Sequence, residues 1–179
     1  MFGSWWGEFI RRTVVIGSHT SPYLKSEQRL GDVIAAIQAM GIYRYYLGSF
    51  KTWAKRISGD EALEGHWKTV FEEHPEFFRL DAEKEKAGLV LRRQRPKRYD
   101  TETGEIITRA TYRSLSKEDQ KKISREPITP DQISALIDVA IKMHTRASEQ
   151  ARDKRWWIPP SLAFVGALAG ALVSALLKS

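Results

Sequence analysis

Cysteine is absent from this sequence of 179 residues. Its absence excludes disulfide bonds, metal sites built from thiolates and a cysteine nucleophile. Histidine is scarce, and its four positions are His19, His66, His74 and His144. No two of them have the i, i+4 spacing that places paired metal ligands on one helix face. We therefore expect no metal site, and we expect His66 and His74 to be solvent-exposed or packing residues.

Several functional signatures are missing as well. There is no glycine-rich phosphate loop, no nucleophile elbow and no metal-binding motif. No secretory signal opens the chain, because the first residues carry Glu8 and lack a continuous apolar run before a cleavage site. These absences predict a protein that is not an enzyme, needs no cofactor and keeps its soluble part in the cytoplasm.

Charge, by contrast, is abundant and unevenly spread. The net charge of +7 suits acidic partners, whether nucleic acid, anionic lipid or an acidic protein. Residues 60–87 carry nine acidic side chains against four basic ones, whereas residues 88–100 carry five basic side chains against Asp100. The five basic residues of the second segment are Arg92, Arg93, Arg95, Lys97 and Arg98.

The longest hydrophobic run is residues 156–177, which contain no charged side chain in 22 positions. A helix of roughly 20 apolar residues crosses the ~30 Å hydrocarbon core of a bilayer. Trp156 and Trp157 stand at one end, where aromatic rings prefer the headgroup level, and basic residues precede them. The run predicts one C-terminal transmembrane helix anchored at the interface by these tryptophans, with residues 1–155 in the cytoplasm. The alternative is a buried C-terminal helix of a soluble fold.

Small residues follow one face of this run. They are Ala163, Gly166, Ala167, Gly170 and Ser174. In lipid, helices associate through close backbone contact at small residues, and Gly166 with Gly170 forms a GxxxG pair. The stripe predicts a homo-oligomer assembled in the bilayer. The alternative is chance, because glycine and alanine are common in membrane spans.

Residues 1–25 form an amphipathic pattern, with apolar residues at helical spacing and two arginines at the polar margin. Such a segment either lies on a membrane surface or packs on its own domain or a neighbouring subunit. The pattern of residues 26–98 predicts a helix at 27–40, an extended segment at 42–47 and a second helix capped by Ser49. A third helix at 61–73 and two strands around a charged turn follow. We expect the strands at "FFRL" and "GLVLRR" and an aromatic core. The core residues are Trp53, Trp67, Phe71, Phe77 and Phe78.

This order of elements resembles a winged-helix domain over residues 26–98. The resemblance implies DNA binding, because many such domains place their third helix in the major groove. Here the third helix is acidic on its outward side, and phosphates would repel it. Its acidic residues are Asp60, Glu61, Glu64, Glu72 and Glu73. The basic segment 92–98 would form the wing and offer charge without base-specific contacts. It is either a solvated turn, a nucleic-acid contact or a surface for a partner protein or neighbouring subunit.

The remaining cytoplasmic part divides into a connecting segment, 99–129, with a short hairpin and helix, and a helical stalk, 130–155. Thr129 with Gln132 makes a capping box at the start of the stalk, and Pro130 takes the first helical position. The stalk carries an apolar stripe formed by Ile133, Leu136, Ile137, Ala140 and Ile141. This stripe needs a partner, either the winged-helix-like domain or the same helix in another subunit.

Together these patterns predict a mainly α (α+β) fold: a winged-helix-like domain, a helical stalk and one C-terminal transmembrane helix. The predicted function is that of a non-enzymatic, membrane-anchored interaction or sensor protein that self-associates through its span. One extension is a bacterial defence effector that perturbs the membrane. A protein partner encoded by a neighbouring gene fits this reading. The alternative is a membrane-tethered, nucleic-acid-binding regulator.

Overall fold

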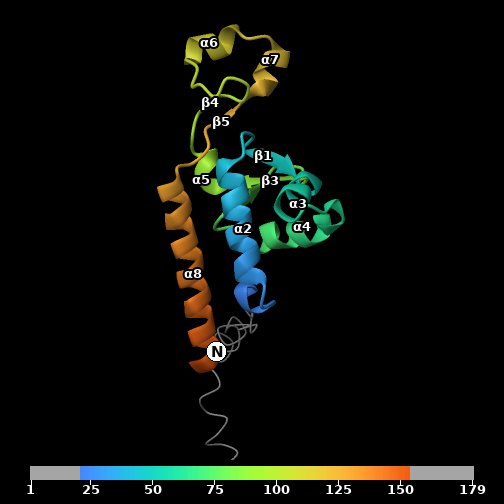
Figure 1. Cartoon of the computed structure of the whole chain (residues 1–179), viewed down its shortest axis with the longest axis vertical. Helices are drawn as coiled ribbons and strands as arrows, with labels where there is room; N and C mark the ends of the chain where they lie inside the picture. The colour runs from blue at the N-terminus through green and yellow to red at the C-terminus, as the bar shows by residue number, and fades with distance from the viewer. Residues whose placement is uncertain (1–20, 154–179) are drawn as a thin grey trace, which may run out of the picture.

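The computed structural model describes residues 21–153, which form a helical body with a small sheet and a protruding lobe (Figure 1). The longer helices are α2 (Arg29–Ile42), α3 (Phe50–Ser58), α4 (Glu64–Glu73) and α8 (Pro130–Asp153). The short helices are η1 (Pro22–Leu24), η2 (Glu61–Leu63), α5 (Val90–Arg93), α6 (Arg109–Ser114) and α7 (Lys117–Lys122). The strands are β1 (Leu47–Ser49), β2 (Phe78–Leu80), β3 (Lys86–Leu89), β4 (Lys97–Asp100) and β5 (Ile123–Arg125).

Local sequence signals determine where several helices begin and end. The Ser49 hydroxyl accepts a hydrogen bond from the backbone N–H of Thr52 at 3.2 Å, which caps α3 as predicted. Gly59 ends α3 with a left-handed φ of 75°. The predicted capping box of α8 is also confirmed. The N–H of Gln132 donates to Thr129 Oγ1 at 3.3 Å, and the N–H of Thr129 donates to Gln132 Oε1 at 3.1 Å.

The larger sheet has the strand order β1–β3–β2, and both pairings are antiparallel. Leu47 and Arg79 each stand opposite Gly88, so these three residues form one row across the sheet. Ala87 and Leu89, on either side of Gly88, are fully buried. Because side chains alternate along a strand, the row of Leu47, Gly88 and Arg79 lies on the opposite, outer face.

The inner face of the sheet packs on an aromatic core supplied mainly by α2, α3 and α4. Trp53 on α3 donates from Nε1 to the carbonyl oxygen of Ala87 at 2.8 Å, which satisfies the buried indole N–H. The core predicted from the sequence is confirmed, because all five of its aromatic residues are buried. They are Trp53, Trp67, Phe71, Phe77 and Phe78.

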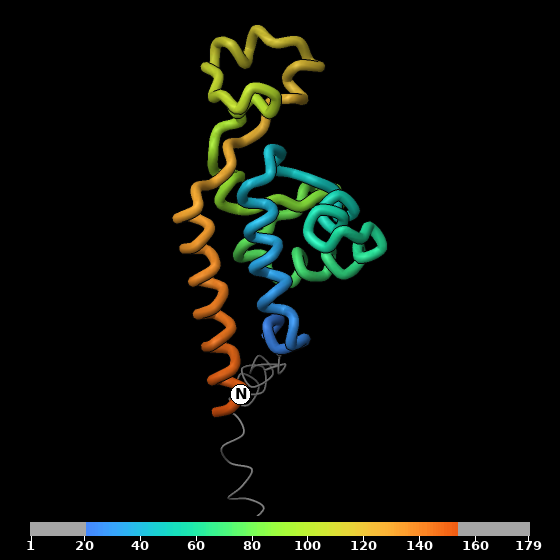
Figure 2. The backbone as a smooth tube through the Cα atoms, in the orientation of Figure 1, coloured from blue at the N-terminus to red at the C-terminus, as the bar shows by residue number. Residues whose placement is uncertain are grey.

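Helix α8 lies alongside α2 over much of its length (Figure 2). Of the two partners that the sequence left open for the apolar stripe, the structure therefore has the helical body of the same chain. Ala140 is buried, and Ile133, Leu136 and Ile137 pack against the core, whereas Ile141, the fifth residue of the stripe, is exposed. At the upper end, a Cβ placed on Gly41 would lie only 3.0 Å from the Ile133 side chain, so glycine allows α8 to start close against α2.

Two predicted strands differ from the structure. The strand expected at 88–93 ends at Leu89, and α5 starts at Val90, whose N–H donates to the carbonyl oxygen of Phe77 at 2.8 Å. The second strand of the short hairpin expected in the connecting segment 99–129 is reduced to a single bridge between Tyr99 and Ile106. Strands β4 and β5 instead form a two-stranded antiparallel stem that carries α6 and α7 as a lobe at one end of the molecule (Figure 1).

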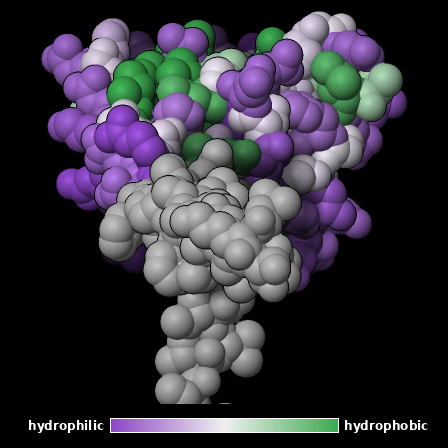
Figure 3. All heavy atoms as spheres, turned by 90° about the horizontal axis from the view of Figure 1, so that it is seen from below, coloured by the Kyte–Doolittle hydropathy of each residue, from purple (hydrophilic) through white to green (hydrophobic). Residues whose placement is uncertain are grey.

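The expected transmembrane helix is contradicted by the structure. Within residues 21–153, no helix is both long enough and apolar enough to cross a membrane. The longest, α8, carries exposed charged residues such as Asp138, Lys142 and Arg146, which a lipid-facing helix does not tolerate. Hydrophilic side chains also dominate the face of the described part shown in Figure 3. The prediction of a membrane-anchored, tail-anchored location is therefore not supported.

The residues on which that prediction depended lie outside the described part of the chain. This applies to the run 156–177 and to most of the amphipathic segment 1–25. It also applies to the expected interface anchors Trp156 and Trp157 and to the expected association face, which consists of Ala163, Gly166, Ala167, Gly170 and Ser174.

Candidate anion-binding site

Arg92, the first residue of the predicted basic wing, is buried. Its side chain is fully inaccessible to solvent, and its guanidinium donates hydrogen bonds to a set of backbone carbonyl oxygens. The acceptors belong to Met40 (2.8 Å), Tyr43, Arg44 (3.3 Å), Tyr45 (3.5 Å), Arg125 and Glu126 (3.2 Å). The expectation that Arg92 meets a partner at the surface is therefore wrong. The chain turns into α5 at Val90 instead of continuing as a strand, and this turn directs Arg92 inward.

The carbonyl cage explains how a charged side chain can be stable inside the protein. Burial lowers the pKa of Arg92 to about 10, and the positive charge of Arg95 acts in the same direction. At neutral pH the guanidinium remains charged, and its N–H groups find carbonyl acceptors. Arg92 thus ties the end of α2, the loop before β1 and the segment after β5 to one another.

The rest of the predicted wing is dispersed over the structure. Arg95 is half-buried and donates to Glu126 Oε2 at 2.8 Å, to the carbonyl oxygen of Pro127 at 2.8 Å and to Gln132 Oε1 at 2.7 Å. Lys97 and Arg98 lie on β4, at the base of the lobe. Of the five wing residues, Arg93 is the one that lines a pocket on the sheet.

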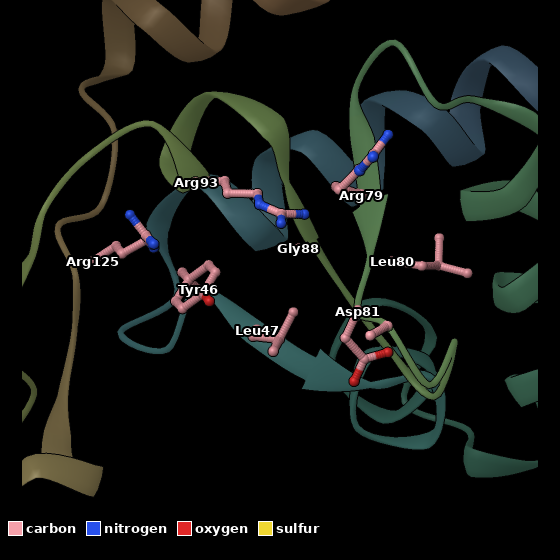
Figure 4. A pocket seen from close by; sticks show the side chains of 9 residues that line it. Tyr46, Leu47, Arg79, Leu80, Asp81, Gly88, Arg93 and Arg125 are labelled. Carbon is pink, nitrogen blue, oxygen red and sulfur yellow. The ribbon is translucent and has the colours of Figure 1, made fainter.

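This pocket lies on the outer face of the β1–β3–β2 sheet and has a volume of about 210 Å³ (Figure 4). Three arginines from three different elements line it: Arg79 from β2, Arg93 from α5 and Arg125 from β5. In the view of Figure 4, the side chain of Arg93 extends over the sheet between the other two. We call this set the arginine pocket. Its other lining residues are Tyr46, Leu47, Leu80, Asp81, Ala82 and Gly88.

Gly88 keeps the floor of the arginine pocket free of side chains. A Cβ at this position would collide with the carbonyl oxygen of Tyr46. The loop before β1 therefore approaches the middle strand closely only because residue 88 is glycine. The pocket floor is bare backbone, and the walls are side chains of Arg79, Leu47 and their neighbours.

Arg125 is held in a defined orientation. Its guanidinium carbon lies 4.8 Å from the centre of the Tyr46 ring, an arrangement in which the cation is attracted to the ring face. Its Nη1 also donates to the carbonyl oxygen of Arg95. Tyr46 is fixed in turn, because its N–H donates to the Ser124 hydroxyl at 3.0 Å. One wall of the pocket is thus preorganised.

The pocket has a strong excess of positive charge. Among its described lining residues, Asp81 is the one carboxylate, and it accepts the N–H groups of Glu85 at 2.9 Å and Lys86 at 3.0 Å. The hydrogen bond from Lys86 is the main cause of the lowered pKa of Asp81. Within residues 21–153, no ion pair joins Arg79, Arg93 or Arg125 to a carboxylate. The pocket lining thus carries three arginines and one carboxylate, and that carboxylate is already hydrogen-bonded in the hairpin turn.

Sequence reasoning found Arg93 but missed Arg79 and Arg125. Arg79 is the outward residue of the predicted strand "FFRL", so strand alternation would have placed it on the outer face. Arg125 carried no such signal, because its position depends on how the lobe returns to the sheet. The grouping of all three arginines arises from tertiary structure alone.

The histidines contribute no metal site within the described part of the chain, where no group of three or more His, Cys, Asp or Glu side chains could hold a metal ion. His74 is fully buried, and its Nδ1 lies 3.0 Å from Glu76 Oε1, which is a packing role. His66 is partly exposed, with Nε2 at 3.2 Å from Asp32 Oδ2. The arginine pocket is therefore the strongest candidate site. Comparisons of the whole chain with models of known families, with curated proteins and with solved structures found no match.

Proposed function

We propose that this chain is a non-enzymatic interaction module that binds an anionic group of a partner in the arginine pocket. The observation that carries the proposal is the convergence of Arg79, Arg93 and Arg125 on one small hollow with no carboxylate paired to them among residues 21–153. Guanidinium groups match the oxygens of phosphate and carboxylate in pairs of parallel hydrogen bonds. Guanidinium groups that no carboxylate neutralises, around a floor of backbone, are therefore suited to such an anion.

We also propose that residues 26–98 form a winged-helix-like domain that acts as the scaffold of this pocket. The support is the order of elements, α2, β1, α3, α4, β2 and β3, together with the strand order β1–β3–β2. This scaffold places the helices on the inner face of the sheet. The outer face, which carries the row of Leu47, Gly88 and Arg79, is left for binding.

The size of the pocket favours one anionic group over a whole small molecule. Sites for drug-sized ligands and cofactors usually have volumes of roughly 300–1,000 Å³. The arginine pocket, at about 210 Å³, is smaller than that range. It fits a charged group that belongs to a larger partner and projects from it.

Nucleic acid is the less favoured partner. On α4, which corresponds to the groove-binding helix of the resemblance, Glu64 and Glu72 are exposed. On η2, Glu61 already pairs with Lys51 at 3.0 Å and with Lys55 at 2.9 Å. Exposed carboxylates would repel the phosphates of a duplex placed along this helix.

The test is a titration of the full-length protein with inorganic phosphate, monitored by NMR. We expect saturable shifts of pocket resonances, which Arg93→Gln and Arg79→Gln each weaken by about tenfold, since each removes charge-assisted hydrogen bonds. Arg113→Gln, at an exposed site on α6, removes the same charge away from the pocket and is the matched control.

Two results would contradict the proposal. If Arg113→Gln weakens phosphate binding as much as Arg93→Gln does, the attraction depends on net charge and not on the pocket. If duplex DNA binds with an affinity that falls steeply with salt and is insensitive to Arg79→Gln, the nucleic-acid alternative takes its place.

A further inference from the structure

Strand β2 is an edge of the sheet, and its backbone pairing shows which groups face outward. The N–H of Val90 donates to the carbonyl oxygen of Phe77, and the N–H of Asp81 donates to the carbonyl oxygen of Lys86. In an antiparallel pair, hydrogen-bonded positions alternate. Arg79, which stands opposite Gly88, therefore directs its N–H and C=O toward β3. Leu80, one residue later, directs both of its backbone groups toward the open edge.

The space beside this edge is open in the described part of the molecule. A hollow of about 460 Å³ lies there, between the end of α4 and the hairpin turn that follows β2. Its lining residues are Phe71, Glu72, Pro75, Phe78, Arg79, Leu80, Asp81 and Lys84. Such an edge with unpaired N–H and C=O groups is a template on which a further strand can pair. The apolar half of this lining would accept apolar side chains of that strand, and the charged half is balanced between two basic and two acidic residues.

Arg79 connects the open edge with the arginine pocket, because it lines both hollows. A charged residue on an edge strand by itself only discourages pairing between sheets. That role does not require two further arginines, Arg93 and Arg125, around the same point. A strand paired to β2 would place its outward side chains beside Arg79, with cross-strand Cβ atoms about 4.5–5.5 Å apart.

A second copy of this chain is a poor occupant of the edge. If β2 paired antiparallel with β2 of another copy around the outward row, Arg79 would face Arg79 of the partner chain. Like charges directly opposite one another destabilise a strand pair. The arginines on this face therefore favour a partner strand that carries negative charge on its outer face.

We propose, on the basis of the function proposed above, that the partner is an extended peptide segment bearing a phosphorylated side chain. The segment adds to the sheet as a strand along the edge of β2, and its phosphate enters the arginine pocket. Phosphate is favoured over carboxylate because it carries close to two negative charges and three acceptor oxygens, which match three guanidinium groups. Main-chain hydrogen bonds to β2 supply affinity, and the arginine pocket makes binding depend on the phosphate.

The test uses nine-residue peptides with a central phosphothreonine and randomised flanks, selected for binding to the full-length protein. The best binder is then resynthesised with a single N-methyl group at each backbone position in turn. We expect a period of two, in which methylation of every second N–H weakens binding by roughly threefold or more and methylation of the others has little effect. Removing the phosphate should abolish detectable binding.

The two levels of the proposal fail in different ways. If phosphate is required but N-methylation has the same effect at every position, the arginine pocket stands and strand addition is wrong. If the unphosphorylated peptide binds as well as the phosphorylated one, the phosphopeptide proposal is wrong. If, in addition, inorganic phosphate does not shift the pocket resonances, the anion-binding function itself is wrong. Arg113→Gln again serves as the control and should leave the affinity of the phosphorylated peptide unchanged.

Discussion

At the scale of single residues, Arg92 shows how a side chain that looks like a binding residue can be structural. It stands in a run of basic residues, yet its guanidinium is surrounded by carbonyl oxygens from three parts of the chain. Its neighbour Arg93 is exposed and lines the pocket. The difference arises from α5, since adjacent residues on a helix point in different directions.

We expect Arg92→Gln to lower the free energy of unfolding by about 3–5 kcal/mol. The reason is that removal of one partner from a buried charged network leaves the others, here several carbonyl oxygens, without hydrogen bonds. Chemical denaturation monitored by tryptophan fluorescence measures the change. Arg93→Gln is the neighbouring control and should stay within about 0.5 kcal/mol, as exposed substitutions do. An Arg92→Gln protein that unfolds at the same denaturant concentration as the parent would show that the cage contributes no stability.

At the scale of elements, the start of α8 is fixed by both local and tertiary contacts. Thr129 and Gln132 cap each other's backbone N–H groups, which the sequence alone predicts. Gln132 Oε1 also accepts from Arg95 Nη2 at 2.7 Å. Arg95, which the sequence predicted to bind a partner, thus joins α8 to the turn after α5.

Thr129→Ala should lower the free energy of unfolding by about 1 kcal/mol, because the hydroxyl that caps the N–H of Gln132 is lost. The measurement is a thermal or urea melt at neutral pH. Ser134→Ala, at an exposed position inside α8, makes a similar truncation without a cap and should cause no loss. Equal destabilisation by the two substitutions would mean that the cap has no particular effect.

At the scale of the whole molecule, a polar cluster around the buried residues Tyr23 and His74 joins three parts of the chain. Tyr23 of η1 donates from its hydroxyl to Glu76 Oε1 at 3.2 Å, and Nδ1 of His74 lies 3.0 Å from the same oxygen. The Tyr23 ring packs edge-on against His74, with centroids 4.5 Å apart, and against His144 of α8 at 6.1 Å. Burial raises the pKa of Tyr23 above its ordinary value, and the negative charge of Glu76 adds to this effect.

This cluster predicts a defined dependence of stability on pH. Burial by itself would raise the pKa of Glu76, but hydrogen bonds from His74, a backbone N–H and Tyr23, with the charge of His74, lower it overall. A carboxyl whose pKa is lower in the folded state stabilises the fold above its unfolded pKa of about 4.3. That stability is lost as the pH falls through the folded pKa.

We therefore expect Glu76→Gln to be less stable than the parent at pH 7 and the difference to shrink as the pH falls below about 4.3. Urea unfolding at several pH values between 7 and 3 measures the difference directly. Glu83→Gln, at an exposed site in the hairpin turn, should show no such trend. A difference between parent and Glu76→Gln that is constant across this range would exclude the linkage.

The sequence by itself determined the features that depend on neighbours along the chain. The cap at Ser49, the capping box at Thr129, the stop at Gly59 and the aromatic core all follow from helical periodicity and short-range hydrogen bonding. The same local reasoning predicted a membrane anchor from residues 156–177. That prediction did not hold, because none of the helices in residues 21–153 suits a bilayer and the run itself lies outside them.

Only the tertiary structure decided which basic residues are available for binding. Arg92 is buried among carbonyl oxygens of residues 40–45 and 125–126, which accept its hydrogen bonds. No local pattern in the sequence brings these oxygens together. The arginine pocket likewise depends on the register that sets Arg79 opposite Gly88, and on the return of the lobe that places Arg125 against Tyr46. Strand pairing and chain reversal act between residues far apart in sequence. Charge and periodicity along the chain therefore predicted that a basic surface exists, while the packing decided which arginines form it.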